Sequence, residues 1–104
     1  MKIKEWLEQA GEPVEDAVYT DPPTMPYILF FDSIQRGGGD LKNLYYRHSL
    51  TIERYSQTSD TNEKLEALLD KGAFKYHKYP TVWMSDEQVF TTIYDNIEFF
   101  EREA

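Results

Sequence analysis

The chain of 104 residues contains no cysteine, which excludes disulfide bonds and thiolate metal sites. Long apolar runs are also missing, because the longest covers only residues 27–31 and is far too short to cross a bilayer. The first residues, Met-Lys-Ile-Lys-Glu-Trp-Leu-Glu, lack the apolar stretch of a signal peptide. We therefore expect a soluble, intracellular protein without a membrane partner.

Basic charge is scarce. The formal net charge is −8, with six acidic and two basic side chains in the first 26 residues and six acidic and one basic in the last 19. Tight nucleic-acid binding is not expected, because it needs a basic surface that neutralises phosphates. The length predicts one domain over residues 1–104, and eight Tyr, six Phe and two Trp supply much of its core.

A proline-rich segment leads into the most apolar stretch. Pro22, Pro23 and Pro26 fix φ and lack an N–H, so they predict an extended approach. Residues 27–31, Tyr-Ile-Leu-Phe-Phe, contain no charged or amide side chain and predict a central strand buried on both faces. Residues 15–19 add a short edge strand.

The next segments predict a hairpin. Residues 32–40 include three successive glycines, Gly37, Gly38 and Gly39, which indicate a mobile connection. Residues 44–58 alternate, with Leu44, Tyr46, His48, Leu50 and Ile52 on one side. This period predicts a long, half-buried strand antiparallel to residues 27–31.

Two helices are expected. Apolar residues at positions 3, 6, 7 and 10 share one helical face, and Gly11 and Pro13 end that helix. Asp60 and Glu63 resemble a capping box in front of Leu65, Leu68 and Leu69. Gly72 ends the second helix.

The C-terminal third reads as strands. Residues 74–84 predict one strand broken at Pro80, and residues 86–88 a turn. Residues 89–97 predict a further strand, with a short helix from Asn96 as the alternative. The resulting class is α+β, an antiparallel sheet with both helices packed on one face.

Chemistry-bearing patterns are weak. The glycine run lacks P-loop spacing, the serines lack a nucleophile-elbow context, and His48 and His77 have no acid at ligand spacing. We expect His48 to be a satisfied, mostly buried ring and His77 to be exposed. No enzyme activity, cofactor or metal is expected, and the many tyrosines favour a protein that packs against other proteins.

The order of features resembles a known group of proteins. An early helix, the segment Pro-Pro-Thr-Met-Pro-Tyr-Ile-Leu-Phe, a loop with Asp40, the pair Tyr45 and Tyr46, a helix with Leu65 and Leu68, and a closing strand pair with the turn Ser-Asp-Glu follow one another. This order is similar to that of the tail-completion, tail-terminator and head–tail joining proteins of phages and prophages of Gram-positive bacteria. The similarity spans nearly the whole chain, and the triple glycine before Asp40 departs from the pattern.

The resemblance implies a structural protein that caps the head-proximal end of the tail tube as a ring, with six copies expected, and joins tail to head. Its partners would be copies of itself, the tail tube protein and the head connector protein, in the host cytoplasm during assembly and then at the tail or head–tail junction. A loop that contacts a neighbouring subunit or the tube is expected at Arg36, Gly37, Gly38, Gly39, Asp40, Leu41 and Lys42. Acidic residues that would face the lumen and repel DNA are Asp86, Glu87, Glu98 and Glu101.

Two alternatives stay open. One is an adaptor or stopper of the head–tail connector, which differs only in its docking partner. The other is an acidic inhibitor that mimics DNA and occupies a host nuclease; it explains the charge but neither the proline-rich approach nor the glycine loop.

Overall fold

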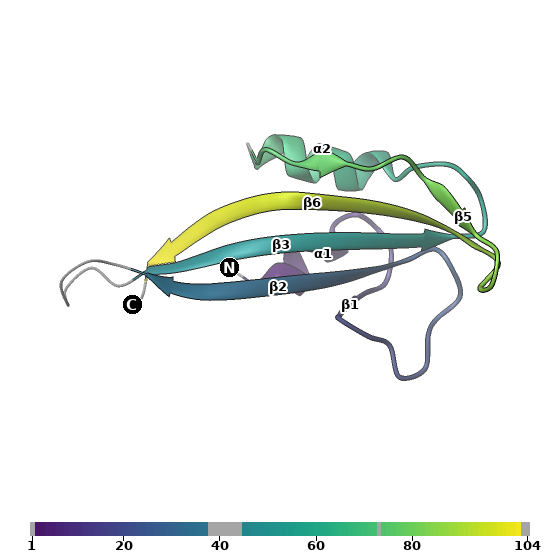
Figure 1. Ribbon diagram of the computed structural model, residues 1–104, viewed down its shortest axis with the longest axis horizontal. Helices are drawn as coiled ribbons and strands as arrows, with labels where there is room; N and C mark the ends of the chain where they lie inside the picture. The colour runs from purple at the N-terminus through teal and green to yellow at the C-terminus, as the bar shows by residue number, and fades with distance from the viewer. Residues whose placement is uncertain (1, 38–44, 73, 103–104) are drawn as a thin grey trace.

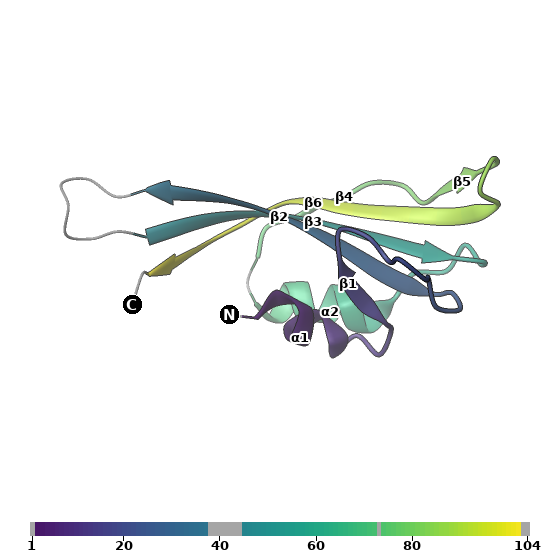
Figure 2. The ribbon, with the colours of Figure 1, turned by 90° about the horizontal axis from the view of Figure 1, so that it is seen from below.

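The computed structural model describes residues 2–37, 45–72 and 74–102. Two helices and six strands follow one another as α1 (Ile3–Glu8), β1 (Val14–Asp16), β2 (Tyr27–Gly37), β3 (Tyr45–Ser56), α2 (Glu63–Lys71), β4 (His77–Lys78), β5 (Val82–Met84) and β6 (Val89–Arg102). The sheet order is β1-β2-β3-β6-β4, and β5 also pairs with β6 (Figure 1). Both helices lie on one face of the sheet (Figure 2), which confirms the predicted α+β class. Among the described strands, β1 alone departs from antiparallel pairing, because it runs parallel to β2.

β2 differs from its prediction in two ways. Ile28 and Phe30 are buried, but Phe31 is 38% exposed, so the strand is buried on one face and not on both. The physical reason is that the helices cover only one side of the sheet. Residues 32–37, expected in a mobile loop, continue the strand and pair with β3. The expected loop residues from Gly38 to Lys42 lie outside the described residues.

The long alternating segment is confirmed as β3, a strand antiparallel to β2 with Tyr27 opposite Tyr55. Its buried side chains include His48, Leu50, Ile52 and Arg54, which follow the predicted period of two. All four therefore face the helices.

β6 is one continuous strand, so the helix proposed from Asn96 is wrong. Its pairing with β3 shifts register between Leu50 and Ile52, and Asn96 has a φ of +61°. This bulge switches the faces of the strand. Tyr94 and Ile97 both point into the core, although they are three residues apart.

The second helix begins later than its capping box predicts. The N-cap is Asn62, whose Oδ1 accepts a hydrogen bond from the backbone N–H of Leu65 at 3.0 Å. Asp60 instead accepts from the Thr58 hydroxyl. Gly72 does end the helix, and the strand predicted to break at Pro80 is indeed split into β4 and β5. Both short strands pair with β6.

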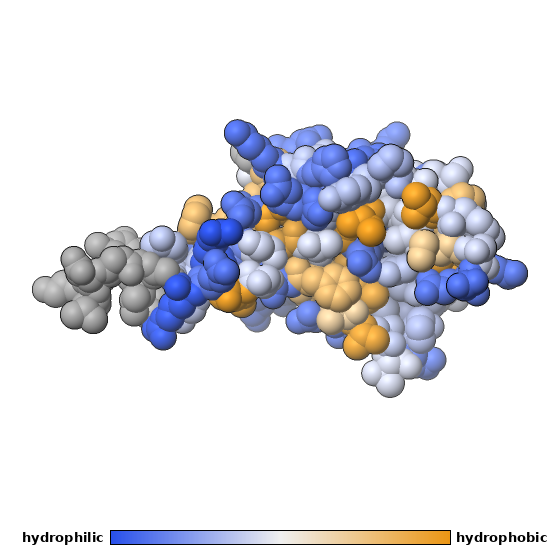
Figure 3. Space-filling view, viewed as in Figure 1, coloured by the Kyte–Doolittle hydropathy of each residue, from blue (hydrophilic) through white to orange (hydrophobic). Residues whose placement is uncertain are grey.

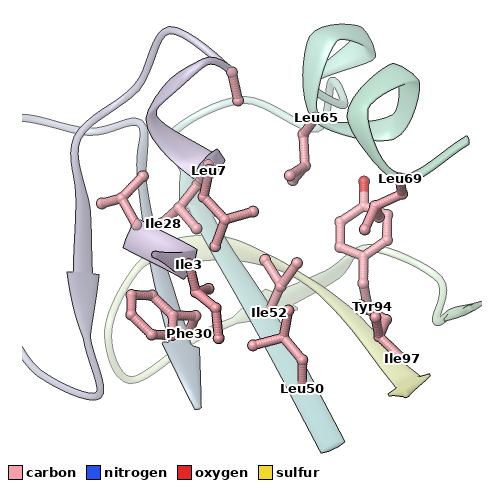
Figure 4. Close-up of a cluster of buried hydrophobic side chains, with 12 residues drawn as sticks. Ile3, Leu7, Ile28, Phe30, Leu50, Ile52, Leu65, Leu69, Tyr94 and Ile97 are labelled. Carbon is pink, nitrogen blue, oxygen red and sulfur yellow. The ribbon is translucent and has the colours of Figure 1, made fainter. Parts of the chain in front are cut away.

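The core lies between the helices and the sheet (Figure 4). Ile3 and Leu7 of α1 and Leu65 and Leu69 of α2 meet the central strands. The sheet residues of this cluster include Ile28, Phe30, Leu50, Ile52, Tyr94 and Ile97. Within the described part of the chain, neither helix is long and apolar enough to span a membrane.

Candidate functional site

The most distinctive feature of the molecule is the end of the sheet where only three strands remain. β1 pairs with β2 only as far as Phe30, and β4 pairs with β6 at Tyr94 and Asp95. Beyond these points the described strands continue as residues 31–37 of β2, 45–50 of β3 and 97–102 of β6, which we call the arm. The ends of these three strands extend past both helices (Figures 1 and 2).

The outer side of β2 in the arm has backbone groups that point away from the sheet. The Ile28 N–H donates to the Pro13 carbonyl, and the Phe30 carbonyl accepts from the Ala17 N–H, so even-numbered residues of β2 face away from β3. Backbone groups alternate sides along a strand. Asp32, Ile34 and Arg36 therefore present their N–H and C=O groups at an edge that pairs with no described strand.

β6 has a second edge of the same kind. Odd-numbered residues of β2 face β3, so their partners on β3 are also odd and the even residues of β3 face β6. His48 and Leu50 lie opposite Phe99 and Ile97, so these two residues of β6 face β3. Glu98 and Phe100, the alternate residues, present their backbone groups outward. Within the described part of the chain, no strand pairs with the outer side of β2 or β6 in the arm, so the arm carries free edges on both sides.

A polar cluster on the helix face fixes the three strands of the arm to one another. His48 Nδ1 lies 2.7 Å from Asp32 Oδ2, and His48 Nε2 lies 3.2 Å from Glu101 Oε2. The imidazole also stacks on Phe99, with ring centroids 4.4 Å apart. The buried, satisfied His48 expected from the sequence is confirmed, although its partners come from strands that the sequence did not connect to it. Exposed His77 is confirmed too.

Ser49 follows His48 on β3 and Ser33 pairs with Ser49, so both serines lie on the opposite face of the sheet from His48, because side chains alternate faces along a strand. Neither serine hydroxyl therefore faces the cluster, whose contacts join the three strands of the arm. Among the residues that the structure describes, no group of three His, Cys, Asp or Glu side chains could hold a metal ion.

The face of the sheet turned away from the helices is open. Apolar side chains gather over the middle of this face (Figure 3). Tyr27 stacks on Tyr55, with ring centroids 5.3 Å apart, and Tyr45 meets Phe100 edge to face. Between these aromatic pairs, Arg47 Nη2 forms an ion pair with Glu98 Oε1 at 2.9 Å, with both side chains nearly half exposed. Aromatic pairs and an exposed ion pair thus share the described part of this face.

The acidic residues expected to line a lumen are not brought together. Asp86 and Glu87 are exposed in the turn between β5 and β6, whereas Glu98 and Glu101 lie at the other end of β6. The last two also face opposite sides of the sheet, because they contact Arg47 and His48, neighbours on β3. Of the expected interface loop, the structure describes only Arg36 and Gly37, at the end of β2.

Sequence reasoning missed a buried ion pair near α2. Arg54, 4% exposed, donates from Nε and Nη2 to the Glu12 carboxylate at 2.9 Å and from Nη1 to the Asp60 carbonyl. The pair lines a surface depression of about 480 Å³. Every nitrogen of the guanidinium is engaged, so Arg54 itself is not available to a ligand in this depression. The signal was an arginine on the apolar side of an alternating strand.

Comparison of the chain with protein-family models, with curated proteins and with solved structures gives no match. The arm is therefore interpreted from its own geometry.

Proposed function

We propose that the chain is a structural subunit that joins copies of itself into a ring, capping the head-proximal end of a phage tail tube and joining tail to head. The observation that carries this proposal is the pair of free edges on the arm. β2 and β6 are both antiparallel to β3, so the two free edges run in the same direction. A contact from one edge to the other edge of the next copy is heterologous, and such contacts generate closed rings or filaments.

The resemblance of the sequence to tail-completion and tail-terminator proteins selects the ring. It supplies the expectations of six copies, a tail tube protein on one side and a head connector protein on the other. The proline-rich approach to β2 is the sharpest motif behind it. In that setting the arm, with the loop that follows Arg36, reaches the adjacent subunit.

The charge supports a conduit for DNA. A net charge of −8 per subunit repels phosphates, so DNA passes through a ring of such subunits without tight binding. Asp86 with Glu87, or one of Glu98 and Glu101, would face the lumen, because Asp86 and Glu87 lie at one end of β6 and the other two residues lie at its far end on opposite sides of the sheet. The proposal thus needs only part of the acidic set at the lumen and not all four residues.

The decisive experiment deletes the gene in an inducible source prophage and measures tail lengths by electron microscopy, with the wild-type gene restored as the control. Overlong tails without heads are the expected result. Tails of normal length beside filled heads would instead assign an adaptor or stopper role at the connector. Intact virions would contradict the proposal, and a nuclease recovered with the protein would then favour the DNA mimic.

A further inference from the structure

We propose that copies of this chain join by parallel pairing of the β6 edge of one copy, residues 97–102, with the β2 edge of the next, residues 31–37. This inference deepens the proposed function, on which its biological setting rests, because it names the contact by which the ring would close. The contact itself is argued from the arm alone.

The two edges match in register. Ile34 and Phe99 both lie opposite His48, Gln35 and Phe100 both lie opposite Arg47, and Arg36 and Glu101 both lie opposite Tyr46. If the sheet of the next copy continues the first without a shift along the strands, Phe100 therefore lies beside Gln35 of the next copy. In a parallel pair of strands, the backbone N–H and C=O of a residue that faces the partner strand bond the residues before and after the one beside it. Phe100 would bond Ile34 and Arg36, the two residues whose backbone groups point outward.

The side chains at these levels are complementary. Ile34, 55% exposed, would cover Phe99 on the helix face, and Arg36 would lie beside Glu101 with opposite charge. Both charged residues already have contacts inside their own chain: Arg36 lies 5.8 Å from the Tyr46 ring centroid, and Glu101 contacts His48. On the open face Phe100, 65% exposed, would lie beside Gln35.

The free edges lack two common protections. Edge strands of soluble proteins are usually blocked by proline, lysine, bulges or covering segments, because an unpaired edge recruits another strand. Residues 31–37 and 96–102 contain neither proline nor lysine. The bulge at Asn96 lies at the inner end of the β6 edge and leaves the residues beyond it in regular pairing with β3.

The absence of cysteine makes the contact directly testable by disulfide trapping. The double variant Gln35→Cys with Phe100→Cys places thiols at aligned, exposed positions of the two edges. Within one copy these positions are two strand spacings apart, about 9.6 Å, which exceeds the ~7 Å limit for a disulfide. Across the proposed contact they are one spacing apart, within reach. Oxidation of the purified full chain at high concentration should therefore give a ladder of covalent oligomers.

Each single variant serves as a control. Gln35→Cys alone and Phe100→Cys alone should give only trace dimer, as should Val82→Cys with Phe100→Cys, since Val82 is exposed but lies on β5, at the other end of β6 from the arm. Efficient dimer from Gln35→Cys alone would overturn the proposal in favour of pairing between two β2 edges. Absence of a ladder from the double variant, with native circular dichroism, would overturn it as well.

A charge exchange tests the register. In the double-cysteine background, Arg36→Glu and Glu101→Arg should each reduce the oligomer yield by about fivefold, and the two together should restore it. Loss of yield without restoration would contradict the Arg36–Glu101 register. If the double-cysteine variant forms covalent oligomers but deletion of the gene leaves tails normal, the contact is upheld and the tail function is refuted. If deletion gives overlong tails but the double-cysteine variant forms no oligomers, the tail function is upheld and this contact is refuted.

Discussion

At the scale of single residues, Arg54 and Glu12 form a buried ion pair in which two guanidinium nitrogens bond the carboxylate. Their side chains are 4% and 12% exposed, and the pair joins β3 to the segment after α1. Removing one partner of a buried pair leaves the other charge uncompensated. We expect Arg54→Ala to lower the free energy of unfolding by about 3 kcal/mol, measured by urea denaturation.

The matched control for this variant is Arg47→Ala. Arg47 lies on the same strand and also makes an ion pair at 2.9 Å, but its side chain is 44% exposed. An exposed pair contributes less than about 1 kcal/mol. Equal losses from the two variants would show that burial of Arg54 does not decide its contribution.

Glu66 gives the stability a pH dependence. Its burial alone would raise its pKa, but hydrogen bonds from Lys78 at 2.8 Å and Tyr94 at 2.7 Å lower the pKa overall, below the ordinary 4.5. Because the folded state favours the ionised form, this stabilisation is fully present above pH 4.5 and is lost as the pH falls through the lowered pKa. We expect Glu66→Gln to be less stable than the native chain at pH 7, and the difference to narrow as the pH is lowered from 4.5 to 3.

Urea midpoints at pH 7 and over this lower pH range measure this difference, and Glu63→Gln, an exposed carboxylate on the same helix, is the control. A gap between native chain and Glu66→Gln that stays constant with pH would contradict the assignment. The same hydrogen bond, after burial, raises the pKa of Tyr94, so the neutral phenol is the form that the fold stabilises.

At the scale of elements, the N-cap of α2 differs between the sequence pattern, which predicts Asp60, and the structure, which has Asn62. Asn62 is 8% exposed, caps the helix through Leu65 N–H and donates from Nδ2 to the Ala10 carbonyl at 3.1 Å. One side chain thus fixes both the helix and the end of the α1 segment. Asn62→Ala should cost about 1–2 kcal/mol, because it removes the cap and leaves a buried carbonyl without its donor.

Asp60→Ala is the paired variant for this test. The capping-box pattern predicts that it costs as much as Asn62→Ala, whereas the observed cap predicts a clearly smaller loss. Thermal unfolding of both variants decides between the two. A larger loss of stability from Asp60→Ala than from Asn62→Ala would indicate that Asp60 is the N-cap.

At the scale of the whole molecule, the arm makes the shape elongated. The principal extents are 50 × 28 × 23 Å and the radius of gyration is 15.1 Å, compared with about 13 Å for a compact chain of this length. Small-angle scattering at low concentration should therefore give a monomer value near 15 Å. A value near 13 Å would mean that the arm folds back in solution. A concentration-dependent rise is expected if the edges pair between copies.

The alternation of β3, the helical period of α1 and α2, and the break near Pro80 were readable from the sequence, because each depends on which side of a local element meets the core. The extension of β2 over residues 32–37 was not predicted, because Asp32, Ser33 and Gln35 have low strand preference. One signal was present: a partner strand of five residues cannot supply backbone hydrogen bonds along the whole of a twelve-residue strand. The length mismatch alone would have predicted strand for residues 32–37.

The sequence by itself thus determined the local elements, their class and the surplus of negative charge, since these follow from residue order and composition. Tertiary structure decided which contacts those elements make. Glu12 meets Arg54 across 42 positions, the bulge at Asn96 reverses the faces of β6, and β1 and β4 pair with only part of β2 and β6. The two free edges arise from those endings. They are a property of packing, which no single segment of the chain encodes.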